Sequence, residues 1–255
     1  MIRRLFFIGC VLSAILSFCG CMKWEEPTML DKNYKDTPFR AANREKNRAK
    51  DIISSQQCAQ SGWYYLHEYK RHKWTSSLKN AGRLFNYCWF FDPENYNSYW
   101  GWGIVMGERA SLVNEKEAEK FLISSLDLFQ LASQKEIPPA EKNNFYMDWA
   151  NAYNGVGAFF AQNDDTAKSL SALNKGKILL LDVLKKEPTN GRAYFLLSVN
   201  FYYRKNYRMA EKNADKAIKY NFSSFPVFLN CSRESREVPE FIVPTLIEKN
   251  TNFFG

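Results

Sequence analysis

Residues 95–107, NYNSYWGWGIVMG, gather tyrosines, tryptophans and glycines that could bind a base, a sugar or a phosphate. Gly101, Gly103 and Gly107 come close to the dinucleotide-binding fingerprint, whose glycines let the backbone approach a pyrophosphate. That fingerprint works only between a strand and a helix, with an acidic residue about 20 positions further on. Because the residues around this stretch have a helical period instead, the sequence disfavours a phosphate loop.

Histidine chemistry depends on His67 and His72, the only two histidines in the chain. Zinc proteases place two histidines at i and i+4 on one helix face. At i and i+5 the two side chains diverge by about 140° on a helix of 3.6 residues per turn. The acidic pair Asp164 and Asp165 lies in polar sequence typical of a solvated loop. We therefore expect no metal, no cofactor and no catalytic residue, and a peptidoglycan-acting enzyme is the enzymatic alternative.

Aromatic residues make up 16% of the chain, and seven of them are tryptophans, so ring faces for a sugar or a peptide are plentiful. Lysines and arginines give a net charge of +8, but they are dispersed along the chain. Nucleic-acid-binding proteins cluster such residues in one patch. We therefore expect no nucleic-acid partner.

From residue 51 onward, apolar residues recur at intervals of three and four, which predicts helices. Turn dipeptides of β-hairpins are nearly absent, so the predicted class is all-α. In residues 191–222, Ala210, Ala214 and Ala217 would let a second helix approach a first helix closely, whereas a bulky residue there would push the helices apart. Cys58 and Cys88 could meet across two antiparallel helices, but we favour two separate buried thiols.

In residues 191–222, large and small residues alternate on two predicted helices at Tyr194, Leu197, Ser198, Phe201, Tyr207, Ala210, Ala214 and Ala217. These residues fall on the eight signature places of the tetratricopeptide repeat (TPR), which the segment therefore resembles. Three weaker copies precede it. The third copy has Tyr146, Trp149, Ala150 and Tyr153 on its first helix and Gly176, Leu180 and Val183 on its second. The second copy has Tyr99, Trp102, Gly103 and Met106 on its first helix and Ala118, Leu122 and Ser125 on its second, and the first copy has Ala81, Phe85 and Cys88 on its second helix. The resemblance implies a right-handed superhelical solenoid of about four TPR-like hairpins over residues 51–225. Extra residues in the third copy imply longer helices or an inserted loop.

In TPR folds the first helix of each hairpin lines a concave groove. Transferred to this register, the resemblance implies groove positions at Asn97, Trp100, Ile104, Asn144, Met147, Asn151, Asn154, Arg192, Phe195, Val199 and Tyr202. A groove of amides, aromatic rings and an arginine suits an extended or helical peptide. The lysine with which chaperone-binding relatives clamp a terminal carboxylate is missing at these positions, so that class of client is disfavoured.

The first residues predict export. Arg3 and Arg4 precede an apolar run over residues 5–18 that is too short to span a membrane but typical of a secretory signal. The sequence Phe18-Cys19-Gly20-Cys21 resembles the lipobox of bacterial lipoproteins. The resemblance implies a signal peptide over residues 1–20, cleaved before Cys21, and a covalent diacylglycerol on the Cys21 thiol, with an acyl chain such as palmitate on its amino group. Two or more acyl chains anchor a protein stably.

The resemblance also implies a location, because Met22 rather than an aspartate follows the lipid-bearing cysteine. We expect the bacterial outer membrane facing the periplasm, with the inner membrane and the cell surface as alternatives. Residues 21–50 are expected to be a polar tether and the start of the first helix, which should begin near Thr37 and Pro38. Residues 226–255 are expected to cap the last hairpin or to serve as an exposed peptide.

These features predict a non-enzymatic, envelope-anchored scaffold that binds a protein partner during assembly of an envelope, pilus, secretion or transport complex. The alternative is a periplasmic component of a transport system that binds a small apolar or glycan ligand. The sequence does not specify the identity of the partner or the oligomeric state.

Overall fold

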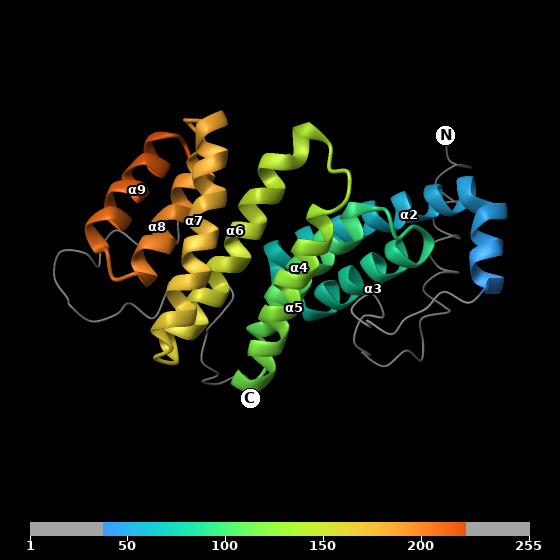
Figure 1. Ribbon diagram of the computed structural model, residues 1–255, viewed down its shortest axis with the longest axis horizontal. Helices are drawn as coiled ribbons and strands as arrows, with labels where there is room; N and C mark the ends of the chain where they lie inside the picture. Colours follow the sequence, from blue (N-terminus) through green and yellow to red (C-terminus); the bar gives the residue numbers. More distant parts are fainter. Residues whose placement is uncertain (1–37, 223–255) are drawn as a thin grey trace. The chain divides into compact units, whose positions relative to one another are not determined.

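The structure is a computed structural model that describes residues 38–222, with side-chain environments from residue 48 onward. These residues form eight α-helices and contain no strand, as the sequence predicts (Figure 1). The helices are α2 Pro38–His72, α3 Thr75–Phe91, α4 Tyr96–Ala110, α5 Glu115–Ser133, α6 Pro139–Gln162, α7 Thr166–Lys186, α8 Gly191–Tyr203 and α9 Tyr207–Lys219. The expected signal peptide, the lipid anchor at Cys21, the tether up to residue 37 and the tail over residues 226–255 lie outside the described residues.

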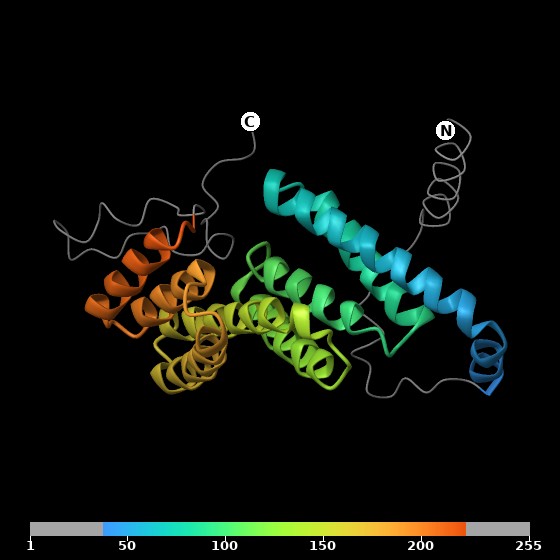
Figure 2. The same ribbon diagram turned by 90° about the horizontal axis from the view of Figure 1, so that it is seen from above.

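The helices pack as four hairpins, in which α2 pairs with α3, α4 with α5, α6 with α7 and α8 with α9. Figure 2 shows α2 and α3, in blue to green-cyan, running side by side. Each hairpin also contacts the next one. Both of its helices touch the first helix of the following hairpin, as α2 and α3 both touch α4. The first helices α2, α4, α6 and α8 therefore form a continuous series, which is the pairing expected of TPR-like hairpins.

Small residues allow the paired helices to approach closely at the predicted places. A Cβ atom added to Gly103 would lie 3.1 Å from the ring of Phe129 on the paired helix. The hydroxyl of Ser125 donates to the Gly103 carbonyl oxygen at 2.7 Å, across the same contact. In the third hairpin, a Cβ atom on Gly176 would lie 3.1 Å from the Ala150 carbonyl oxygen. The predicted register of the second and third hairpins is therefore confirmed.

The extra residues of the third hairpin lengthen its helices and do not form an inserted loop. Helix α6 has 24 residues and α7 has 21, and only residues 163–165 separate them. Asp164 turns the chain with a φ angle of 59°, a conformation that aspartate tolerates better than most residues. The side chain of Asp165 then accepts from the Lys168 backbone N–H at 3.0 Å and caps α7.

Helix α2 begins at Pro38, where the sequence predicts a helix start. Among the described helices, none combines the length and the apolar character needed to cross a bilayer. Cys58 and Cys88 are free thiols buried in one small cluster with Ala59 between α2 and α3. Burial raises the pKa of Cys58 to about 11 and that of Cys88 to about 12, so both thiols are protonated at neutral pH.

Candidate partner-binding cleft

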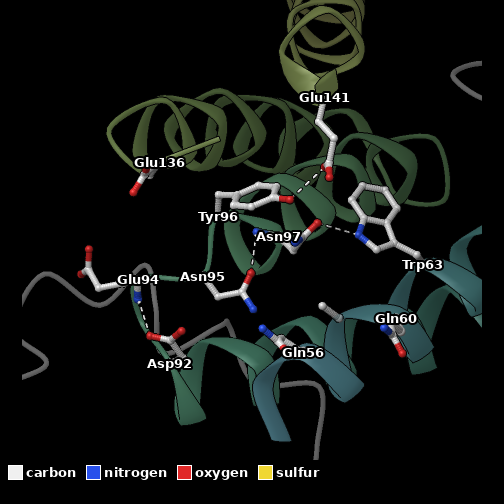
Figure 3. A pocket seen from close by; sticks show the side chains of 11 residues that line it. Gln56, Gln60, Trp63, Asp92, Glu94, Asn95, Tyr96, Asn97, Glu136 and Glu141 are labelled. Atoms are coloured by element: carbon white, nitrogen blue, oxygen red, sulfur yellow. Dashed lines mark hydrogen bonds between the residues drawn. The ribbon is translucent and has the colours of Figure 1, made fainter. Parts of the chain in front are cut away.

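A cleft of about 660 Å³ lies between α2, the turn that leads into α4, and the start of α6 (Figure 3). Helix α2 contributes Gln56, Gln60 and Trp63, which are spaced at i, i+4 and i+7 and therefore share one helix face. Asp92 and residues 94–97 form a second wall, and Glu136 and Glu141 form a third. First helices from three successive hairpins thus bound one cleft.

The turn before α4 is held in place by its own side chains. The Asp92 carboxylate accepts from the Glu94 backbone N–H at 3.1 Å, and the Asn95 side chain accepts from the Asn97 backbone N–H at 3.1 Å, which caps α4. The Asn95 amide nitrogen also donates to the Ser55 hydroxyl at 2.9 Å, and this bond ties the turn to α2. The wall is therefore fixed before any ligand arrives.

Two further hydrogen bonds set the shape of the cleft. The Trp63 indole N–H donates to the Asn97 side-chain oxygen at 2.9 Å, and the Tyr96 hydroxyl donates to Glu141 Oε2 at 2.9 Å (Figure 3). Burial and the Glu141 carboxylate raise the pKa of Tyr96 to about 12, so the hydroxyl keeps its proton and remains a donor at neutral pH. These bonds join α2 to α4 and α4 to α6 across the floor of the cleft.

The cleft carries carboxylates from all sides except α2, and they are Asp92, Glu94, Glu136 and Glu141. Within the described residues 38–222, no lysine, arginine or histidine lines it. Lys135 lies next to the cleft and pairs with Glu94 at 2.7 Å. Among the described residues, no three acidic, histidine or cysteine side chains are close enough to hold one metal ion. The four carboxylates come from the turn before α4, the segment before α6 and the first turn of α6.

A connected series of contacts runs along all four first helices. It begins at Trp63, whose ring packs edge-on against the ring of Trp100 at 5.1 Å between centroids. The Trp100 indole N–H donates to Asp148 Oδ2 at 3.0 Å, and the other oxygen of Asp148 pairs with Arg192. Asp148, whose side chain is only 11% exposed, thus links α4 to α8 through α6.

Trp63 and Asp148 were missed by the transfer of groove positions from the TPR pattern. The signature of the first hairpin is too weak to place Trp63, and Asp148 falls between two positions of the pattern. A signal for Asp148 was present, since it is the only charged residue between Asn143 and Gln162. A lone acid in such an apolar helix needs a partner when it is buried.

The predicted groove residues divide by exposure. Asn144 and Asn151 are exposed; Asn97, Ile104, Arg192 and Tyr202 are half-buried; Trp100, Met147, Asn154, Phe195 and Val199 are buried. The aromatic platform expected at Trp100 is not open to solvent, because the ring is 5% exposed and lies against Trp63 and Phe145. Of the predicted set, only Asn97 lines the cleft. Partner binding by the exposed asparagines stays a prediction.

Asn154 has a structural contact that explains its burial. Its amide nitrogen donates to the Leu196 carbonyl oxygen at 2.9 Å, and its side-chain oxygen accepts from the Asn200 amide at 2.7 Å. Asn200 also donates to the Leu173 carbonyl oxygen at 2.8 Å. These amides join α6, α7 and α8. Their hydrogen bonds go to each other and to backbone carbonyl oxygens within the fold.

Comparison with solved structures finds a likeness to the crystal structure of YrrB, described as a TPR protein with an unusual peptide-binding site. The likeness has a TM-score of 0.25 and 15% sequence identity, and it covers 72% of this chain and 93% of that one. No family model matches the chain. No curated protein matches it either. The class of protein, an all-α array of TPR-like hairpins, is defined by the helix pairing and the register of small residues described above.

Proposed function

We propose that this protein is a non-enzymatic scaffold that binds an extended segment of a protein partner in the cleft between α2, α4 and α6. The observation that carries the proposal is the convergence of three first helices on one cleft whose walls are already held by hydrogen bonds. A preformed site loses less conformational entropy on binding than a mobile one. Exposed amides at Gln56 and Gln60 can hydrogen-bond a peptide backbone.

We further propose that the scaffold lies in the bacterial envelope, anchored by lipid at Cys21 and facing the periplasm from the outer membrane. The apolar run over residues 5–18 and the Gly20-Cys21 sequence support this location. The partner would then belong to an envelope, pilus, secretion or transport complex. The tether up to residue 37 would allow the cleft to reach a partner away from the lipid surface.

A glycan is the second candidate ligand, in line with a role in transport. Trp63 lies beside carboxylates and amides in the cleft, and sugars combine ring stacking with hydrogen bonds to such groups. A purely apolar ligand is disfavoured, because it would bury the carboxylates and amides without partners.

Site-specific crosslinking in intact envelopes tests the cleft. A photoreactive amino acid at Gln60, which is exposed and lines the cleft, should crosslink to one discrete protein, with the crosslinked peptide mapped by mass spectrometry. The same amino acid at Glu211, exposed on α9, is the matched control. Equal capture from both positions, or capture of glycan alone at Gln60, would contradict the proposal.

The anchor is tested separately with Cys21→Ala. This chain should lack the mass of the diacylglycerol and should leave the membrane fraction, whereas Cys19→Ala should keep both the lipid and the location. A Cys21→Ala chain that is still lipidated and membrane-bound would refute the assignment of the anchor.

A further inference from the structure

We propose that the segment bound in the cleft is basic, so that its lysine or arginine side chains meet the carboxylates of the cleft. This inference rests on the proposed function, because it assigns the chemistry of the partner at that same site. The chain as a whole has a net charge of +8, yet the part of it that the structure describes lines the cleft with four carboxylates and with no basic residue. A negative cleft in a positive protein favours a cationic guest over an anionic one.

The distribution of the carboxylates favours an extended cation over a metal ion. They come from separate places: Asp92 and Glu94 from the turn before α4, Glu136 from the segment before α6, and Glu141 from the first turn of α6 (Figure 3). Among the described residues, no three of them could share one metal ion. A segment with several positive side chains can reach carboxylates on different walls at once.

The carboxylates differ in how far they are already occupied. Glu94 pairs with Lys135, so a guest gains least from that carboxylate. Glu141 accepts one bond from Tyr96, but a carboxylate can accept about four. Glu136 is exposed at the rim of the cleft. We therefore assign the main recognition of positive side chains to Glu136 and Glu141.

The remaining lining residues favour a peptide over a free polyamine. Carboxylates alone would attract any small cation, whereas Gln56 and Gln60 present amides that match a peptide backbone. The half-buried Trp63 adds an indole ring next to these amides, and an ammonium or guanidinium group over such a ring is attracted to its face. The combination of amides, indole and separated carboxylates fits a peptide with basic side chains.

Fluorescence anisotropy with defined peptides tests the inference on the full chain in a neutral detergent. The probe is a fluorescein-labelled, end-capped octapeptide of alternating alanine and lysine, and the reference is its alanine–glutamine counterpart. We expect the lysine peptide to bind about tenfold or more tightly than the glutamine peptide at low salt. The difference should shrink as the ionic strength rises, since exposed charges are screened within about 10 Å at 0.1 M salt.

The double variant Glu136→Gln with Glu141→Gln removes two charges from the cleft, and glutamine can still accept the Tyr96 hydrogen bond. It should weaken binding of the lysine peptide roughly three- to tenfold, as expected for two partly exposed ion pairs, and leave the glutamine peptide unaffected. The control variant Glu211→Gln with Asp215→Asn removes the same charge from exposed positions on α9. It should bind both peptides as the unmodified chain does, with thermal unfolding confirming that both variants fold.

Equal binding of the lysine and glutamine peptides, or of neither, would overturn the inference. An equal loss in the α9 control would show that only the overall charge matters, and displacement by spermidine as effective as by the lysine peptide would show that the backbone is not recognised. If Gln60 still crosslinks to a protein when the lysine peptide fails, the scaffold function stands and the basic segment is refuted. If the peptide binds but Gln60 captures no protein in envelopes, the scaffold function is refuted.

Discussion

The contacts between the first two hairpins and those between the last two are built from different chemistry. Between α2, α3 and α4, aromatic rings fill spaces left by glycines: a Cβ atom on Gly101 would lie 2.2 Å from the ring of Phe85, and one on Gly82 would lie 2.6 Å from the ring of Trp102. Between α6, α7 and α8, the fully buried Asn200 bonds to Asn154 and to backbone instead. The first region packs rings against glycines, whereas the last region adds a network of buried amides to its apolar packing.

The difference explains why the first hairpin departs from the TPR pattern. Phe85 occupies the place that Ala214 holds in the last hairpin, where a bulky residue was expected to push the helices apart. The structure accommodates Phe85 because Gly62 and Gly101 face its ring, with Cβ positions that would lie 2.8 Å and 2.2 Å away. Gly101 has no role in the TPR pattern itself. Its role here is to leave room for the ring of Phe85, the bulky residue that α3 carries at a place where the pattern has alanine.

The largest loss of stability is expected when the Phe85 ring is removed from between the first two hairpins. Phe85→Ala should lower the free energy of unfolding by about 3–5 kcal/mol, because it leaves a cavity between facing glycines that have no side chains to fill it. Urea denaturation followed by circular dichroism measures the change. Phe90→Ala, at an exposed ring on the same helix, should cost less than about 1 kcal/mol. Similar costs for both variants would refute the ring-in-glycine packing.

The corresponding test of the second region is Asn200→Ala. Loss of this amide leaves the buried Leu173 carbonyl oxygen and the Asn154 side chain short of partners, so we expect a cost of about 1–3 kcal/mol. The same denaturation assay applies, with Asn151→Ala on the exposed face of α6 as control. That control should change stability by less than about 0.5 kcal/mol. A stable Asn200→Ala chain would mean that apolar packing alone holds the last hairpins together.

Two glycines on α4 sharpen the comparison further. Gly101→Ala should destabilise the chain by about 1–3 kcal/mol, because the new methyl group overlaps the buried Phe85 ring. Gly107→Ala meets only the Ser125 hydroxyl at 3.6 Å and should stabilise the helix by about 0.5–1 kcal/mol. Thermal unfolding should therefore shift in opposite directions for the two variants. A shift in the same direction would remove the special role of Gly101.

The smallest difference in stability between the two regions is expected at their helix caps, Asn95 before α4 and Asn206 before α9. Asn206→Ala removes only the cap of α9, at a cost of about 1 kcal/mol. Asn95→Ala removes the cap of α4 and also the bond to Ser55, so it should cost more than Asn206→Ala. It should also weaken binding in the cleft, because the turn before α4 loses its tie to α2. Equal costs for the two variants would show that the bond to Ser55 contributes nothing to stability.

Much of the hairpin register could be predicted because it depends on local spacing. Ala210, Ala214 and Ala217, at i, i+4 and i+7, mark one face of one helix, and Ala214 and Ala217 are indeed buried. The candidate site could not be predicted in the same way. Trp63, Asn97 and Glu141 come from three hairpins, and their spacing along the chain does not indicate that they share one cleft.

The sequence by itself determined the all-α class, the pairing of helices into hairpins and the places where small residues lie, because each depends on periodicity within one or two neighbouring helices. Only the tertiary structure decided that Trp100 is buried, that Asp148 links α4 to α8, and that a carboxylate-lined cleft forms beside α2. The physical reason is the contact between successive first helices. Their packing brings together residues more than 40 positions apart, such as Trp100 and Asp148, and so decides which side chains are enclosed and which can meet a partner.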